Sequence, residues 1–283
     1  MSIKRIEFLV KSCWMKNAMI ETGRLVAKHT CQLFYVTGET FEPRGSGVLF
    51  QHDGRYFLLS AGHVLKCLLS NKNPDRPLLI EMGIPNGKEL IMVSGQLDVN
   101  DEDHIDIGLM ELQKEVVEDL NDYYSFLTID NVGIGHIGVA TMQYVISGFP
   151  IENTKGRRNP IDIKTKPIHL STLIVPQPSM GELPKWQVAY AYNRLAAIDS
   201  HTGNRIIGPE AIGVSGGGAW FVEVDDTGSL THNYKLAGIA VQHPDGTANV
   251  IVTTKVDLFT ETLRQKFGLN IPKSHLIKVN LLT

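Results

Sequence analysis

The chain has 283 residues, a formal net charge of −3 and 20% charged residues. This length suits one large β domain or two small barrels that share a cleft. Nucleic-acid binding usually needs clustered Lys and Arg, and the one basic cluster, residues 155–158, lies among Gly, Asn and Pro as in a solvated loop. No run of about 18 apolar residues occurs, so we expect neither a transmembrane helix nor a membrane partner.

Only three cysteines are present, Cys13, Cys31 and Cys67. Such a sparse, odd set favours reduced thiols over a disulfide framework, and it lacks the paired spacing of a zinc site. The first ten residues carry charges that lie too close together for the apolar region of a signal peptide. We therefore expect a cytoplasmic protein without a bound metal.

The N-terminal residues 1–30 predict an extension with one helix over 12–28, where apolar residues recur at a ragged helical period interrupted by Gly23. Short β-type runs separated by Gly, Pro, Asn and Asp then predict a first barrel over residues 31–113. Asp53-Gly54 predicts a hairpin turn, because Gly supplies the positive φ that a tight turn needs. The expected strands are 31–36, 47–51, 56–60, 78–82, 89–96 and 107–112.

A polar, partly helical stretch over 114–128 predicts a connector, which we place at 114–137. A second barrel is expected over 138–257, and a C-terminal helix and tail over 258–283. The expected strands of the second barrel are 139–149, 161–175, 186–192, 219–224, 236–242 and 250–254. Apolar residues at helical spacing over 257–267 predict that the helix caps the second barrel. The predicted fold is all-β, with two antiparallel six-stranded barrels.

Three short stretches hold a histidine, an aspartate and a serine in a fixed order. His63 ends Leu-Leu-Ser-Ala-Gly-His, Asp106 lies in His-Ile-Asp-Ile-Gly-Leu, and Ser215 lies in Gly-Val-Ser-Gly-Gly. A serine hydroxyl becomes a good nucleophile when an imidazole takes its proton and a carboxylate holds the imidazole in the useful tautomer. The order His, Asp, Ser belongs to the chymotrypsin-like arrangement and differs from those of subtilisins and α/β-hydrolases.

Each of these residues also has a purely structural interpretation. His63 is one of ten histidines, and a histidine after an apolar strand is often only hydrogen-bonded in place. Asp103 competes with Asp106, and either could be a surface turn acid. We favour Asp106 because it begins an apolar strand, where a buried carboxylate could meet an imidazole. The glycines around Ser215 could form a loop without chemical meaning.

Further blocks around these residues resemble those of the trypsin-like (chymotrypsin-fold) serine peptidases of the intracellular or bacterial type. They are Gly-Ser-Gly-Val-Leu-Phe (45–50), Tyr-Phe-Leu-Leu-Ser-Ala-Gly-His-Val (56–64), Asp-Ile-Gly-Leu (106–109), Ser-Gly-Phe-Pro (147–150), Lys-Leu-Ala-Gly-Ile-Ala (235–240) and Thr-Thr-Lys-Val (253–256). The resemblance covers most of residues 31–267. It implies Greek-key barrels and an acyl-enzyme mechanism that needs no cofactor. A flexible Gly213 would let its own N–H and that of Ser215 form an oxyanion hole.

Two departures from the family pattern affect regulation and specificity. Secreted members usually carry an aspartate directly before the nucleophile, and this chain has Val214 there, so activation by clipping near the N-terminus is not expected. The floor of the primary specificity pocket would be Pro209, with walls at His243 and Ile251. A floor without an acid predicts a small or apolar side chain before the scissile bond, although a one-residue slip would put Glu210 there.

The leading hypothesis is a serine endopeptidase that binds a polypeptide in extended form along a strand edge formed by Gly238, Val241 and Gln242. A second hypothesis keeps this activity silent until a regulatory protein or signal acts, as in bacterial defence or stress modules, an association that comes from the family alone. The alternative is a catalytically silent chymotrypsin-fold module that only binds peptides. Labelling of Ser215 by an organophosphonate or fluorophosphonate distinguishes the endopeptidase from the catalytically silent binding module.

Overall fold

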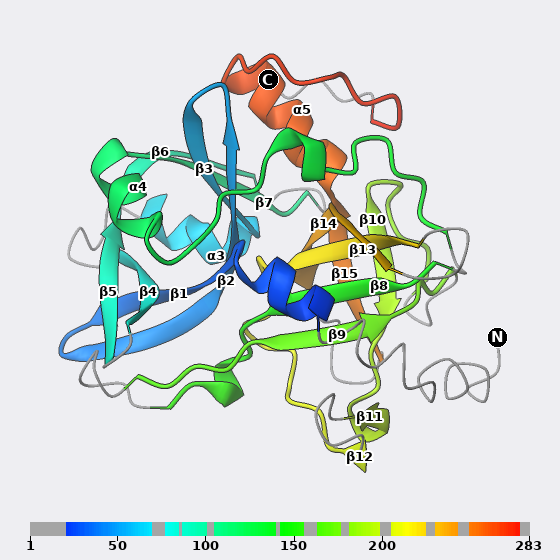
Figure 1. Cartoon of the computed structure of the whole chain (residues 1–283), viewed down its shortest axis with the longest axis horizontal. Helices are drawn as coiled ribbons and strands as arrows, with labels where there is room; N and C mark the ends of the chain where they lie inside the picture. The colour runs from blue at the N-terminus through cyan, green and yellow to red at the C-terminus, as the bar shows by residue number, and fades with distance from the viewer. Residues whose placement is uncertain are drawn as a thin grey trace.

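The computed structural model describes residues 21–69, 77–84, 87–100, 105–139, 142–155, 163–176, 181–198, 205–224, 230–242 and 249–277. Two curled antiparallel sheets dominate the molecule (Figure 1). The first sheet contains β1 (Thr30–Thr37), β2 (Thr40–His52), β3 (Arg55–Ser60), β4 (Leu78–Ile84), β5 (Gly87–Val93), β6 (Gly95–Asn100) and β7 (Ile107–Leu112). The second sheet contains β8 (Tyr144–Gly148), β9 (Ile168–Thr172), β10 (Gln187–Ala191), β13 (Gly218–Val224), β14 (Leu230–Gln242) and β15 (Val250–Lys255).

The first sheet closes on itself through one bent segment. Its strand order is β5-β4-β1-β2-β3-β7-β6, so the two edge strands β5 and β6 are consecutive in the chain and only Ser94 separates them. The bend needs a glycine, because a Cβ on Gly95 would lie 1.7 Å from the Glu111 carbonyl oxygen. The sequence predicted one strand over 89–96 and missed this bend. Because the bend divides that segment into β5 and β6, the sheet has seven strands and not six.

The second sheet closes in a similar way. Its order is β10-β15-β14-β13-β8-β9, and the residues that follow β9 return to pair with β10. Val175 donates its N–H to the Ala189 carbonyl at 2.9 Å, and Ala191 donates to the Leu173 carbonyl at 3.0 Å. Both edges of the sheet are thereby joined into a barrel.

The two barrels share one topology. With β5 and β6 counted as one bent strand, each barrel has its strands in the cyclic order first, second, third, sixth, fifth, fourth. The fourth strand therefore lies beside the first, which is the Greek-key arrangement. The structure confirms the predicted pair of antiparallel Greek-key barrels, here called the first barrel (β1–β7) and the second barrel (β8–β10 and β13–β15).

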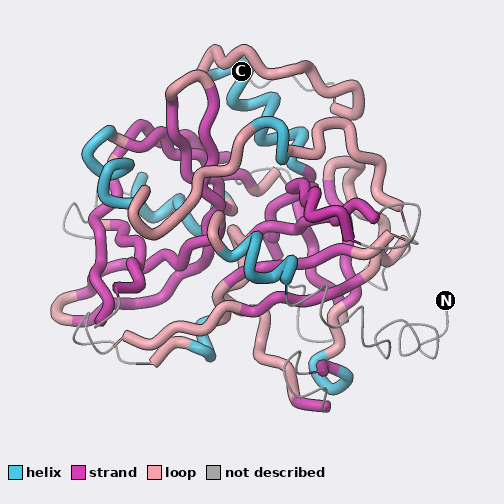
Figure 2. The backbone as a smooth tube through the Cα atoms, viewed as in Figure 1, coloured by secondary structure: helices cyan, strands magenta, loops and turns pink. Residues whose placement is uncertain are grey.

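Helical segments are short and lie around the strands (Figure 2). Besides a helix over residues 21–27, they are α3 (Gly62–Leu65), η1 (Lys66–Leu69), α4 (Lys114–Leu120), η2 (Ile129–Asn131), η3 (Ile151–Asn153), η5 (Arg194–Ala196) and α5 (Val256–Lys266). A small ribbon of β11 (Ala197–Ile198) and β12 (Arg205–Ile206) projects beyond the second barrel (Figure 1). Among the helices of the described residues, none is long and apolar enough to cross a lipid bilayer.

The described part of the N-terminal extension is helical over residues 21–27. Gly23, which the sequence analysis took as an interruption, lies inside this helix and against the His169 ring of β9, to which an added Cβ would approach within 2.8 Å. Val26 of the same helix is fully buried. Residues 12–20 of the predicted helix lie outside the described residues.

The core consists of the two barrel interiors and a seam between the barrels. In β2, Val48 and Phe50 belong to the seam cluster, whereas Leu49 belongs to the interior of the first barrel. In β13, Trp220 faces the seam and Phe221 faces the interior of the second barrel. Strands that are buried on both faces appear in the sequence as continuous apolar runs.

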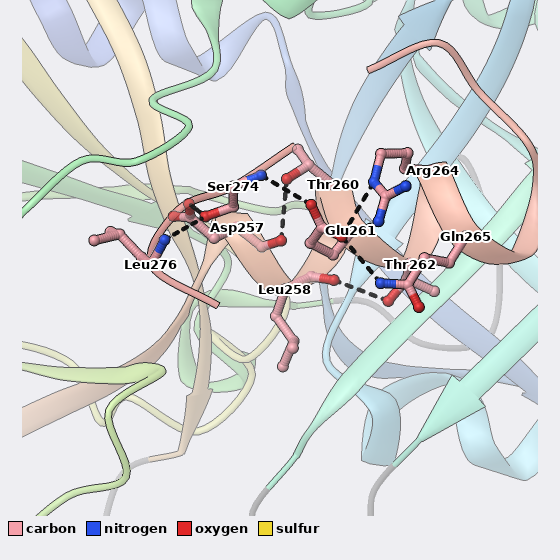
Figure 3. Close-up of polar contacts among 9 residues, drawn as sticks. All are labelled: Asp257, Leu258, Thr260, Glu261, Thr262, Arg264, Gln265, Ser274 and Leu276. Atoms are coloured by element: carbon pink, nitrogen blue, oxygen red, sulfur yellow. Dashed lines mark hydrogen bonds and ion pairs between the residues drawn. The ribbon is translucent and has the colours of Figure 1, made fainter. Parts of the chain in front are cut away.

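Helix α5 packs against both barrels, whereas the sequence predicted only its contact with the second barrel. The Phe267 ring that follows it stands edge-on to Phe57 of β3, with centroids 5.4 Å apart, and Phe259 lies in the seam with Trp220. Two buried acids of α5 accept hydrogen bonds from Ser274, in the segment that follows the helix (Figure 3). Asp257 accepts from the Ser274 hydroxyl, and Glu261 accepts from the Ser274 N–H at 2.8 Å.

Candidate active site

His63 and Asp106 form a two-point contact. The Asp106 Oδ2 atom lies 2.7 Å from His63 Nδ1, and its Oδ1 atom accepts the His63 backbone N–H at 2.9 Å. The two residues meet because β3 and β7 pair, with Ser60 opposite Gly108; His63 follows the end of β3 and Asp106 directly precedes β7. A carboxylate with both oxygens engaged holds the imidazole in one orientation.

This contact determines which imidazole nitrogen is available. When Nδ1 carries the proton and donates it to a carboxylate, Nε2 is left as the acceptor. The His63 side chain is 49% exposed and the Asp106 side chain 20% exposed. The carboxylate is therefore mostly shielded, while the far edge of the ring can be reached by a ligand.

Ser215 lies in a tight loop, residues 211–217, that leads into β13. Val214 donates its N–H to the Ala211 carbonyl at 3.0 Å, and Gly217 donates to the Val214 carbonyl at 2.8 Å. Gly213 and Gly216 have φ values of +92° and +88°, which side-chain-bearing residues rarely adopt. A Cβ on Gly216 would also lie 1.8 Å from the Ser46 carbonyl oxygen.

Contacts with β2 attach this loop to the first barrel. Ser46 donates its N–H to the Ser215 carbonyl at 2.7 Å, and its hydroxyl donates to the Gly213 carbonyl at 2.9 Å. A Cβ on Gly45 would lie 2.9 Å from both the Ser215 carbonyl oxygen and Val64 Cγ2. Gly45 therefore separates Ser215 from the residue after His63. Ser215 and Val64 thus lie on either side of one glycine where the two barrels meet, and in the described residues no hydrogen bond joins the Ser215 hydroxyl to His63.

The Ser215 hydroxyl is only weakly held. It is half-buried and donates to the Val241 carbonyl at 3.5 Å, near the upper limit for a hydrogen bond. Within the described ranges, the backbone N–H groups of Gly213 and Ser215 donate to no other residue. Two N–H groups flanking a serine hydroxyl are therefore free to bind a carbonyl oxygen.

The residues predicted for the specificity pocket fall in different places. The Tyr192 hydroxyl donates to the Pro209 carbonyl. Glu210 is exposed, and its carboxylate pairs with Arg194 at 2.9 Å. Ile251 is 2% exposed and packs inside the second barrel, so it offers no wall to a ligand in this structure. His243 lies outside the described residues, as does Asp103, which competed with Asp106.

The predicted peptide-binding edge is only partly an edge. Gly238 pairs with Ala219 on one side and with Lys255 on the other, so the prediction that it lies at an edge was wrong. β14 is an interior strand of its barrel, which the local sequence could not reveal. Val241 and Gln242 extend past Gly218, the first residue of β13, so β13 does not pair with them; Val241 is nevertheless 2% exposed, and its carbonyl accepts from the Ser215 hydroxyl.

Sequence reasoning missed the role of Ser46. Its hydroxyl donates to the Gly213 carbonyl and accepts the Phe149 N–H at 2.8 Å, thereby joining three segments of the chain. The Gly-Ser-Gly block that contains Ser46 was named only for its resemblance to the peptidase family, and no local pattern indicates partners more than 100 residues away. Within the ranges that the structure describes, no three His, Cys, Asp or Glu side chains gather as a metal site.

Comparison with solved structures finds a similarity to the MamO protease domain from Magnetospirillum magneticum in its apo form. The TM-score is 0.48 and the sequence identity 13%, and the match covers 84% of this chain and 97% of that one. No family model and no curated protein sequence matches the chain.

Proposed function

We propose that this protein is a serine endopeptidase with Ser215 as nucleophile, His63 as general base and Asp106 as the group that orients His63. The two-point contact between Asp106 and His63 carries the proposal, because it leaves Nε2 as the proton acceptor. The tight loop that holds Ser215 beside two uncommitted N–H groups is the second support.

The reaction would proceed through an acyl-enzyme. The Ser215 oxygen attacks the scissile carbonyl while its proton passes to His63 Nε2, and the Gly213 and Ser215 N–H groups bind the oxygen that gains charge. His63 then gives the proton to the leaving amine as the carbon–nitrogen bond breaks. Water then attacks the acyl-enzyme carbonyl while His63 takes its proton. His63 returns that proton to the Ser215 oxygen as the ester bond breaks, which releases the acid. Losing one oxyanion donor typically lowers turnover by about 10²–10³.

The substrate would be a polypeptide bound in extended form against the backbone of Val241 and Gln242, which β13 does not pair with, and it would displace the Ser215 hydroxyl from the Val241 carbonyl. We further propose a small or apolar side chain before the scissile bond, because two acids near the pocket floor, Glu210 and Glu152, are already paired with Arg194. Among the described residues, Cys31 is a buried free thiol, which supports the cytoplasmic location that we propose; burial raises the pKa of this thiol, which keeps it unreactive.

Labelling with a fluorophosphonate, followed by mass spectrometry of the adduct, tests the nucleophile. We expect one adduct on Ser215 in the wild type, no adduct in Ser215→Ala, and normal labelling in Ser125→Ala, which removes another serine that is exposed. An unlabelled but folded wild type would contradict the proposal. The silent peptide-binding module would then be preferred, and the donation of the Ser215 hydroxyl to Val241 is the observation that favours it.

A further inference from the structure

Arg44 occupies a β-bulge in the wall of the candidate active site. Along β1 and β2, Leu33 pairs with Gly45 and Phe34 pairs with Pro43, so Arg44 is the extra residue between two regular pairs. A bulge redirects the side chain that it carries and is over-represented next to active sites. The Arg44 side chain is exposed.

The bulge lies beside the backbone of Ser215. The next residue, Gly45, is so close that an added Cβ would lie 2.9 Å from the Ser215 carbonyl oxygen, and the residue after that, Ser46, donates to this oxygen. Arg44 thus lies two residues before Ser46, which donates a hydrogen bond to the backbone carbonyl of the candidate nucleophile.

The guanidinium is directed toward the His63 side of the site. Arg44 Cζ lies 5.6 Å from the centroid of the Tyr35 ring, and the Tyr35 hydroxyl donates to the carbonyl of Val64, the residue after His63. Packing on a ring face fixes the position of a guanidinium without using its N–H donors.

The charge of Arg44 is not neutralised within the described residues. Arg55, Arg194 and Arg264 each donate to a glutamate, at 2.6–2.9 Å. Arg44 makes no ion pair or hydrogen bond in the described part of the chain, although it is held in place by an aromatic ring. A positioned, unpaired guanidinium at a cleft wall is suited to bind a carboxylate.

We infer that Arg44 is a specificity-determining residue that binds a carboxylate on the leaving-group side of the scissile bond, within the first two residues after it. This inference rests on the proposed function. The backbone of Val241 and Gln242, in the second barrel and beyond the pairing with β13, would hold the acyl half of the peptide. The leaving-group half must then cross the opposite wall, which is formed by β2 of the first barrel and carries Arg44.

Acyl transfer to added peptide amides measures which side chains the leaving-group side of the site prefers. The assay does not require the natural cleavage sequence. A small p-nitrophenyl ester acylates the enzyme, and dipeptide amides with Glu, Gln or Lys at either position compete with water for the acyl group. In the wild type we expect the Glu acceptors to be favoured about threefold to fivefold over Gln, the size typical of exposed ion pairs, and the preference to weaken with added salt.

Three variants decide the assignment. Arg44→Glu should reverse the preference toward Lys acceptors, Arg44→Gln should abolish it, and Arg44→Lys should keep part of it. Lys114→Glu, which changes the net charge equally on the highly exposed face of α4, should leave the preference unchanged. Equal use of Glu and Gln acceptors by the wild type, or an unchanged preference in Arg44→Glu, would overturn the inference alone. Failure of the ester to acylate the wild type would overturn the peptidase proposal and this inference with it.

Discussion

Both oxygens of Asp106 are occupied, one by the imidazole of His63 and one by the backbone of the same residue. An asparagine could still accept the backbone N–H, but its NH2 group would then face Nδ1 and favour the wrong tautomer. We therefore expect Asp106→Asn to lower turnover by about 10⁴ while the protein stays folded. Initial rates of ester hydrolysis and of fluorophosphonate labelling measure this change.

Asp103→Asn is the matched control, because it removes a neighbouring acid that competed for the same role in the sequence. It should retain nearly all of the activity. If Asp106→Asn lost less than about tenfold, or if Asp103→Asn lost as much, the orienting role of Asp106 would be wrong.

Local motifs named His63, Asp106 and Ser215 as candidates, because each lies in a short block of recognisable residues, and the structure brings the first two into contact. They could not identify Ser46 or Arg44. The role of Ser46 depends on contacts with residues 103 and 167 positions away. The role of Arg44 depends on the register between β1 and β2, which only the paired strands define.

At the scale of the elements, closure of the first barrel depends on the bend between β5 and β6. A Cβ at position 95 would meet the Glu111 carbonyl, which is backbone of the paired strand β7 and cannot move away cheaply. We expect Gly95→Ala to lower the free energy of unfolding by about 3 kcal/mol, as overpacking at a rigid contact does. Urea unfolding followed by tryptophan fluorescence measures the loss.

Gly38→Ala separates this steric effect from the general cost of replacing a glycine. Gly38 has a φ of +60° and no atom within 4 Å of an added Cβ, so its replacement should cost only about 1 kcal/mol of backbone strain. Similar losses in the two variants would mean that the β5–β6 bend tolerates a side chain.

Strands were easier to predict than the positions of elements. Apolar runs bounded by turn residues identified the strands of both barrels, since most strands are buried on two faces. The contact of α5 with the first barrel could not be derived, because an apolar helix face does not indicate every surface that covers it. The same limit applies to Gly238, which was predicted to lie at a strand edge but is paired on both sides in the sheet.

At the scale of the whole molecule, two histidines join separate parts of the fold. His29, just before β1, is within 2.6 Å of the Ser125 carbonyl and 2.7 Å of the Tyr234 hydroxyl in β14. Burial lowers the pKa of His29 more than the Ser125 carbonyl raises it. His169, in β9 against the N-terminal helix, has a pKa lowered by burial to about 4.

These lowered pKa values predict a loss of stability in mild acid. Above pH 6.5 both histidines are neutral in the folded and the unfolded chain, so their contribution is constant. Between pH 6.5 and about 4 the unfolded chain binds a proton at His169 that the folded chain does not. The free energy of unfolding should therefore fall by about 1.4 kcal/mol per pH unit from this residue alone, or roughly 3 kcal/mol over the whole window.

Urea unfolding at pH 7, 6 and 5 distinguishes His169 from the acids that titrate lower. His169→Gln removes the titrating ring, so its free energy of unfolding should decline less steeply with falling pH than that of the wild type. His275→Gln replaces an exposed histidine and should keep the wild-type slope. A slope unchanged in His169→Gln would assign the acid sensitivity elsewhere, with His29 at the junction of the two barrels as the next residue to replace. Because the His29 ring joins the connector at Ser125 to Tyr234 of the second barrel, its protonation would weaken the contact between these two segments.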